Sequence, residues 1–320
     1  MIIPNLEVVY PTNTNIAPPG WRPQIDIIFI HDLGGSPKAT WHHDGSGKTW
    51  ISDPDFLGSF KESVRIWTYG YNSEPAANMT PASIALHADD LLASIMNGYR
   101  EYSGGPTIFI AHGLGGIIVK KAVELYTCCP EYFVVKDLTA GIVFLGTAHH
   151  PTDSEGVLKA VKATVTAGLT KHSVDPPMDE IRQFSEAVRD VNSTFVNKSL
   201  PHILVLNCLA MRSIKLTADD GTSSKTRIVP RRCGEIDSVN VKNIALDCNH
   251  FELTQIPLPS SRAHSLFFEK IEEMTKAILA QDKRRVIFSS PPPAPPNPAG
   301  SSPPSPPDPG EKAWQAGKYA

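Results

Sequence analysis

The sequence lacks two features that would point to particular partners, an excess of positive charge and long apolar runs. Its 30 basic and 33 acidic side chains leave a net charge of -3. A nucleic-acid-binding surface requires a basic excess, so we expect no nucleic acid among the partners. No stretch supplies the ~20 apolar residues that a membrane-spanning helix needs, and the amino terminus shows no secretory signal. We therefore expect an intracellular, cytoplasmic protein without a transmembrane segment.

Cysteine is also scarce, and its spacing excludes the usual zinc and redox motifs. The five cysteines include the neighbours Cys128 and Cys129, but no Cys-x-x-Cys pattern occurs. Such thiols are expected to be free in a reducing compartment. The chain also has no glycine-rich nucleotide-binding loop. These absences favour a protein that works without a redox centre and without a nucleotide.

Histidine offers two short clusters that could in principle hold a metal. These clusters are His42, His43 and Asp44, and His149, His150 and Asp153. Both fall in stretches expected to be loops, and neighbouring histidines seldom converge on one ion without further ligands. We interpret them as solvated polar loops, so we expect no metal and no cofactor.

The composition divides the chain into a globular part, residues 1–285, and a proline-rich tail, residues 286–320. From Pro291 to Pro309 the sequence is mostly Pro, Ser, Ala and Gly, which cannot form a packed core. Two runs in this tail, residues 293–296 and 303–306, match the Pro-x-x-Pro pattern that SH3- or WW-type domains bind. A disordered linker is the alternative interpretation of the tail.

The globular part alternates short β-branched runs with helical periodicity, which predicts an α/β fold with a mostly parallel central sheet and helices on both faces. The predicted strands are Ile25–Ile30, Ser63–Tyr69, Thr107–Ala111, Leu138–Leu145 and His202–Asn207. Residues 151–200 form an insertion with two helical stretches. This insertion is either a helical cap over the carboxyl ends of the strands or a pair of ordinary packing helices.

The most informative stretch runs from Thr107 to Gly116, where a buried strand is followed by a sharp turn and the start of a helix. This is the context of a nucleophile elbow, whose central residue carries the attacking hydroxyl. Here that residue is Gly113. A second loop, His31 to Ser36, follows the first strand and contains Leu33 and Gly34. Its position predicts an oxyanion loop that acts together with the amide of Leu114.

Several runs, taken in order, resemble one family across about residues 20–280. The runs are Ile28–Gly35, Lys38–Trp41, Thr68–Ser73, Ile110–Gly116 and Ile142–His149. The family comprises lipase-like serine esterases with an α/β-hydrolase fold, related to the serine-active-site-containing proteins and to the hydrolase-like domains of fungal NLR-type receptors. The resemblance implies esterase or lipase ancestry and a triad in the order serine, acid, histidine.

The resemblance assigns the triad histidine but leaves the acid open. The histidine position corresponds to His250. The acid position corresponds to Ala210, which cannot act as an acid. Asp219 or Asp220, in the following loop, could act as the acid instead. Glu235 and Asp237 are less favoured alternatives for the same role.

Departures from the family pattern point toward lost catalysis. Gly113 has no hydroxyl, and Asp32 stands where the family usually has glycine, so its charge would oppose an oxyanion unless the side chain points away. We therefore expect a catalytically inactive domain that binds a small apolar or acyl ligand or acts in protein interaction and signalling. The alternative is an active ester hydrolase, with a substitute nucleophile or a sequence error at residue 113. Ser36 is such a substitute, although turn capping is its usual role, and His250 could instead activate water.

Overall fold

The computed structural model describes residues 5–11, 23–43, 47–53, 63–75, 79–102, 104–168, 176–198, 202–217, 223–238, 241–255 and 262–289. The chain divides into two compact units, Met1–Asp282 and Lys283–Ala320. The sheet and the candidate site lie in the first unit. The proline-rich stretch of the predicted tail lies outside the described residues.

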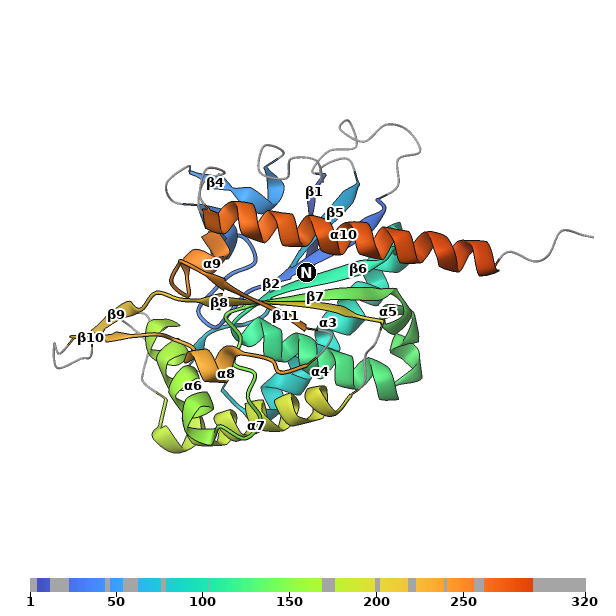
Figure 1. Ribbon diagram of the computed structural model, residues 1–320. Helices are drawn as coiled ribbons and strands as arrows, with labels where there is room; N and C mark the ends of the chain where they lie inside the picture. Colours follow the sequence, from blue (N-terminus) through green and yellow to red (C-terminus); the bar gives the residue numbers. More distant parts are fainter. Residues whose placement is uncertain are drawn as a thin grey trace, which may run out of the picture. The chain divides into compact units, whose positions relative to one another are not determined.

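A seven-stranded sheet forms the centre of the first unit (Figure 1), with the strand order β1-β5-β2-β6-β7-β8-β11. Strand β1 is antiparallel to β5, and the other neighbouring strands are parallel. The strands are β1 (Leu6–Tyr10), β2 (Ile25–Ile30), β5 (Val64–Tyr69), β6 (Thr107–His112), β7 (Thr139–Leu145), β8 (Leu204–Ala210) and β11 (Val241–Leu246). The sheet confirms the predicted mostly parallel α/β architecture.

Helices cover both faces of this sheet because its central strands are apolar on both sides. In β2, Ile27 and Phe29 join one core cluster, and Ile28 and Ile30 join the other. The first cluster includes apolar residues of α10, and the second includes those of α3 and α4 (Figure 1). The helices are α3 (Pro81–Tyr102), α4 (Leu114–Cys128), α5 (Phe133–Leu138), α6 (Ser154–Gly168), α7 (Met178–Asn197), α8 (Arg231–Gly234), α9 (Glu252–Gln255) and α10 (Arg262–Ser289).

Several strands were not predicted, and the last predicted strand is displaced. Strand β11 was missed because its exposed and buried residues mix without a clear apolar run. The others are the edge strand β1 and two short hairpins, β3 (His42–His43) with β4 (Lys48–Thr49) and β9 (Ile214–Thr217) with β10 (Ser223–Thr226). Strand β8 continues to Ala210, so this residue ends a strand instead of following one.

The insertion at residues 151–200 contains helices α6 and α7, which bury their own apolar cluster next to the candidate site. Phe184 and Val188 of α7 pack in this cluster with Leu33 and Leu114. The end of α6 also touches the loop after β2, since a side-chain carbon built on Gly34 would lie 2.7 Å from the Cα of Gly168. The two helices therefore pack against residues that follow β2 and β6.

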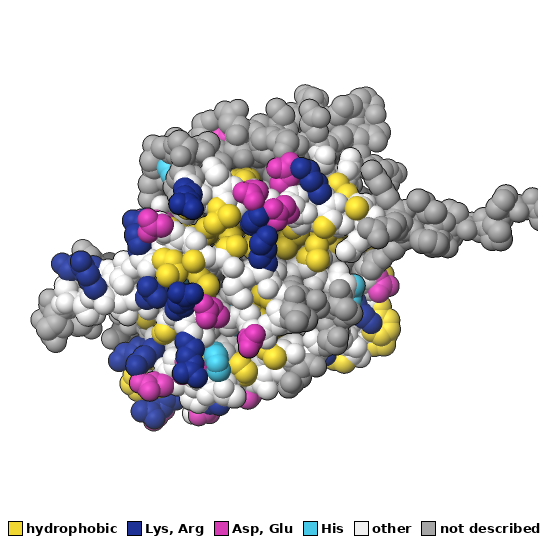
Figure 2. Space-filling model, viewed as in Figure 1, with side chains coloured by type: hydrophobic (Ala, Val, Ile, Leu, Met, Phe, Trp, Pro, Cys, Tyr) yellow, Lys and Arg dark blue, Asp and Glu magenta, His cyan; other side chains and the backbone are white. Residues whose placement is uncertain are grey.

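The surface carries both signs of charge. Figure 2 shows basic and acidic side chains side by side on the face that includes α10, with apolar side chains between them. Among the described residues, no helix is both long and apolar enough to cross a membrane.

Candidate active site

The predicted elbow is present between β6 and α4, with Gly113 at its centre. Gly113 has φ 50° and ψ -117°, a backbone conformation that glycine adopts at little cost and other residues rarely adopt. Its amide donates to the carbonyl of Leu145 at 2.9 Å, and the hydroxyl of Thr147 donates to its own carbonyl at 3.0 Å. The turn is thus held on both sides although residue 113 has no side chain.

The Asp32 side chain points into the site, where its Oδ1 atom accepts two backbone hydrogen bonds. The amide of Leu33 donates at 2.8 Å and the amide of Leu114 donates at 2.6 Å. These are two of the three residues predicted to form the oxyanion loop. The third, Gly34, directs its amide to the carbonyl of Ser73 at 2.8 Å instead. One carboxylate oxygen therefore lies where the two remaining amides converge.

The absence of a side chain at residue 113 and the inward position of Asp32 depend on each other. A side-chain carbon built on Gly113 would lie 2.0 Å from both the carboxyl carbon and Oδ2 of Asp32. Two such atoms cannot approach closer than about 3 Å without repulsion. Asp32 therefore occupies the space that the side chain of a nucleophile would need.

His250 contacts the second carboxylate oxygen. Its Nε2 atom lies 3.0 Å from Oδ2 of Asp32, and both side chains are almost fully buried. Burial alone would raise the pKa of the Asp32 carboxyl, but the hydrogen bond from His250, the nearby imidazoles and the Leu114 amide together hold this pKa below its usual value. The buried carboxylate is therefore kept ionised by its neighbours.

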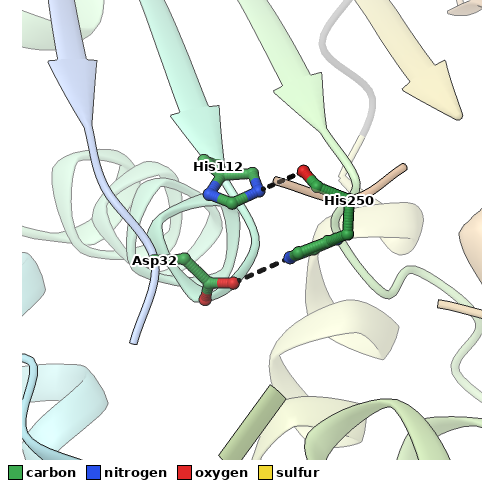
Figure 3. Close-up of side chains that lie close together, drawn as sticks. All are labelled: Asp32, His112 and His250. Atoms are coloured by element: carbon green, nitrogen blue, oxygen red, sulfur yellow. Dashed lines mark hydrogen bonds and ion pairs between the residues drawn. The ribbon is translucent and has the colours of Figure 1, made fainter. Parts of the chain in front are cut away.

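His112, the last residue of β6, completes a group of three polar side chains (Figure 3) that sequence reasoning did not identify. Its Nε2 atom donates to the backbone carbonyl of His250 at 3.1 Å, and the two imidazole rings lie 4.4 Å apart. Burial lowers the pKa of His112 to about 3. The ring is therefore neutral at physiological pH, with its single proton on Nε2.

Two ring nitrogens at the site remain unpaired. Nδ1 of His112 and Nδ1 of His250 are buried and have no hydrogen-bond partner within the described part of the chain. In a serine triad the acid accepts a hydrogen bond from the nitrogen that His250 leaves unpaired. The described residues thus supply no acid to Nδ1 of His250, and the carboxylate of Asp32 contacts the opposite ring nitrogen.

The acid candidates agree with this finding as far as they are described. Ala210 is half-buried at the end of β8, and Asp219 and Asp220 lie outside the described residues. Glu235 forms a surface ion pair with Arg231 at 2.8 Å, and Asp237 is exposed.

The substitute nucleophile Ser36 has a local role, and the neighbouring thiols lie at the other end of the helix that follows the turn. The hydroxyl of Ser36 accepts a hydrogen bond from the amide of Ala39 at 3.0 Å, which is the turn-capping arrangement. Cys128 and Cys129 follow one another at the far end of α4.

One of the predicted loop clusters is not solvated. His149 is 2% exposed and lies between the ammonium of Lys120 and the side-chain amide of Asn207. The expectation of a solvated loop was therefore wrong for this histidine. It is buried because these partners satisfy both of its ring nitrogens.

An apolar cavity lies beside Gly113, between the elbow and the two insertion helices. Its wall includes Leu33, Leu114, Phe184 and Val188, and it leaves about 30 Å³ for the centres of water molecules. This volume holds only one or two waters. A larger ligand would require α6 and α7 to move apart.

Comparisons with known proteins identify sequence relatives of the chain. No family model matches the chain. Human protein SERAC1 is 27% identical over 283 residues, which cover 80% of this chain and 39% of that protein. Zebrafish (Danio rerio) protein SERAC1 is 25% identical over 196 residues, 54% of this chain and 28% of that protein. The chain therefore spans less than half the length of these relatives.

A comparison with solved structures identifies the fold of the chain. An esterase from the fungus Rhizomucor miehei aligns with 83% of this chain and 78% of its own, with 13% identity and a TM-score of 0.51. At this identity the likeness shows the fold alone. The chain has the α/β-hydrolase fold that the resemblance predicted.

Proposed function

We propose that this domain lacks serine-esterase chemistry and acts as a module for ligand binding or for protein interaction and signalling. The observation that carries the proposal is the position of the Asp32 carboxylate. One of its oxygens accepts both amides that would stabilise an oxyanion, and the carboxyl group fills the space of the nucleophile.

The chemistry of acyl transfer explains why this arrangement opposes catalysis. The reaction needs a nucleophile, a base oriented by an acid, and free donors aimed at the developing oxyanion. Losing a single oxyanion donor typically costs about 10²- to 10³-fold in rate. Here both donors are already bound to a negative charge, and the nucleophile position is glycine. Among the described residues, no acid contacts Nδ1 of His250, the nitrogen through which a triad acid would orient the ring.

The inward Asp32 side chain and a side chain at residue 113 exclude each other, and we call this relation the interlock. It also bears on the alternative of a sequence error at residue 113. A serine there would place its side-chain carbon 2.0 Å from the Asp32 carboxyl group. An error would therefore have to coincide with an aspartate whose present inward position excludes a side chain at residue 113. This favours inactivity over an active ester hydrolase with a misread serine.

The ligand that suits the remaining cavity is small and apolar or acyl in character. The cavity wall is almost wholly apolar, with Leu33 and Leu114 on the side of the site and Phe184 and Val188 on α7. Burial of apolar surface would provide the binding free energy, and separation of α6 and α7 would oppose it.

The interaction role is a further part of the proposal. It rests on the resemblance to the hydrolase-like domains of fungal NLR-type receptors, and on the two Pro-x-x-Pro runs that fit an SH3- or WW-type partner inside the cell.

A set of four proteins tests the inactivity: wild type, Gly113→Ser, Asp32→Gly and the double variant Asp32→Gly/Gly113→Ser. Each is treated with a fluorophosphonate probe and with short-chain p-nitrophenyl esters. We expect labelling in the double variant alone, because only it has both the hydroxyl and two free amides. His250→Ala in the double background should reduce this labelling.

Other outcomes would contradict the proposal. Labelling or ester turnover by wild type would show a working nucleophile, and Ser36→Ala would then be the first variant to examine. Labelling by Gly113→Ser alone would show that Asp32 does not block the site. Silence of a folded double variant would show that more than these two residues prevents catalysis.

A further inference from the structure

We propose that Asp32, His112 and His250 form a binding site for one divalent transition-metal ion of the zinc type. The proposal rests on the placement of three ligand atoms and their supporting hydrogen bonds. It does not depend on whether the domain is catalytically inactive.

The three side chains are close enough to share an ion. One potential ligand atom from each residue lies within 4.8 Å of those of the other two, and no other such group occurs in the described ranges. Oδ2 of Asp32 and Nε2 of His250 are 3.0 Å apart. Tetrahedral zinc with bonds of about 2.0 to 2.1 Å separates its ligand atoms by about 3.3 Å, so this pair needs almost no movement.

His112 is prepared as a ligand by the hydrogen bond on the opposite side of its ring. Nε2 donates its proton to the carbonyl of His250 at 3.1 Å, which leaves Nδ1 with a free lone pair. This residue is 2% exposed, and its Nδ1 has no partner among the described residues. Metal-bound histidines are usually held in this way, by donation from the second ring nitrogen to a carbonyl or carboxylate.

Asp32 is supported in the same manner. Oδ1 accepts the amides of Leu33 and Leu114, so Oδ2 is the oxygen turned toward the two histidines (Figure 3). Carboxylates that bind metals through one oxygen are commonly hydrogen-bonded through the other. The buried negative charge would be compensated by a cation, and the ion would replace the proton between Asp32 and His250.

The ligand types indicate the class of ion. Two imidazoles and one carboxylate suit zinc and similar transition metals, whereas calcium and magnesium prefer oxygen ligands alone. Three protein ligands leave a fourth position for water or another ligand. The sequence could not show this site, because His112 and His250 are 138 positions apart and Asp32 and His250 are 218 apart.

The test is a metal titration of the full chain after removal of metal with a chelator. We expect one equivalent of Zn²⁺ to bind by calorimetry, and Co²⁺ to give the visible absorption of a tetrahedral complex with nitrogen ligands. His112→Gln and Asp32→Asn should each weaken Zn²⁺ binding by at least about 100-fold. The double variant His42→Ala/His43→Ala is the control for adventitious surface binding and should keep wild-type affinity.

Circular dichroism and thermal unfolding accompany each variant. If His112→Gln does not fold, the Zn²⁺ affinity of Asp32→Asn decides whether the proposal holds, because this variant preserves the shape of the side chain. Wild type without stoichiometric Zn²⁺ or without the Co²⁺ absorption would overturn the proposal. Unchanged affinity in folded Asp32→Asn or His112→Gln would also overturn it, as would loss of binding in the His42/His43 control alone. Fluorophosphonate labelling is a separate readout, so the two proposals can fail independently.

Discussion

Two buried polar clusters lie near the carboxyl ends of the strands, and they differ in how completely they are bonded. In one, Lys120 donates to Nδ1 of His149 and to Oδ1 of Asn192, both at 2.6 Å, and Nε2 of His149 donates to Asn207 at 3.1 Å. In the other, His112 and His250 each have one buried nitrogen, Nδ1, without a partner among the described residues.

This difference separates a structural network from a candidate site. Buried polar groups in folded proteins are normally hydrogen-bonded, and leaving one unpaired costs about 1 to 3 kcal/mol. The Lys120 cluster meets this rule and connects α4 to α7 through Asn192. The Asp32 cluster breaks it at two atoms, which is expected where a ligand or a lost partner would complete the bonding.

The largest expected effect is a loss of stability when Lys120, the donor in the fully hydrogen-bonded cluster, is replaced. Lys120→Met keeps most of the side-chain volume but leaves His149 and Asn192 without their donor. We expect the free energy of unfolding to fall by about 3 kcal/mol, measured by urea denaturation. Lys121→Met, one residue along the same helix, is the control and should change it by less than about 0.5 kcal/mol. Equal losses of unfolding free energy in Lys120→Met and Lys121→Met would contradict the structural role given to the Lys120 cluster.

The second prediction concerns acid. Burial, and then the charge of Lys120, hold the pKa of His149 well below 6.5. Below pH 6.5 the unfolded chain therefore binds a proton at this residue that the folded chain does not, so stability falls as pH falls. The slope from this group is at most about 1.4 kcal/mol per pH unit.

Urea denaturation between pH 7 and pH 5 measures this slope. The variant His149→Gln should lose stability less steeply than wild type over this range. Parallel curves for the two proteins would contradict the assigned neutral state of His149.

The third prediction tests the interlock at the other cluster. Gly113→Ala should destabilise the protein by about 3 kcal/mol, because it combines an unfavourable backbone conformation with a clash against Asp32. In the Asp32→Gly background the same substitution should cost only about 1 kcal/mol, the backbone part. Gly47→Ala has a similar positive φ but nothing within 4 Å, so it measures the backbone part alone. A coupling of zero in this double-mutant cycle would refute the interlock.

The smallest expected effect is at Ser36. Removing its hydroxyl in Ser36→Ala deletes one hydrogen bond to the Ala39 amide, so stability should fall by about 0.5 to 1 kcal/mol. Fluorophosphonate labelling should remain at the wild-type level. A change in labelling would instead assign Ser36 to the site.

The sequence predicted the central strands well because strands buried on both faces consist mostly of apolar residues, as in Ile25–Ile30, where Asp26 is the one charged residue. It missed β11, in which exposed polar residues interrupt the apolar ones. The elbow was predictable since its glycines and its place between strand and helix are local features. The direction of the Asp32 side chain was not, because it depends on contacts with residues 82 and 218 positions away.

A signal for the Asp32 contact was nevertheless present. In the family that the sequence resembles, the position of Asp32 is usually glycine and the position of Gly113 is usually serine. The side chain is larger than usual at residue 32 and smaller than usual at residue 113. Such opposite changes in size indicate that the two side chains would occupy the same space. His112 gave no comparable signal, because it lies at a position of the elbow motif that requires no particular residue type.

The shared space also limits which substitutions the two positions accept. A side chain at residue 113 and the present inward position of Asp32 exclude each other, so a change at one residue alters what the other tolerates. A codon change that introduces serine at residue 113 would meet the carboxylate, and we expect it to lower stability unless residue 32 changes as well. We therefore expect substitutions at residues 32 and 113 to be coupled, so that each is accepted more readily together with the other than alone.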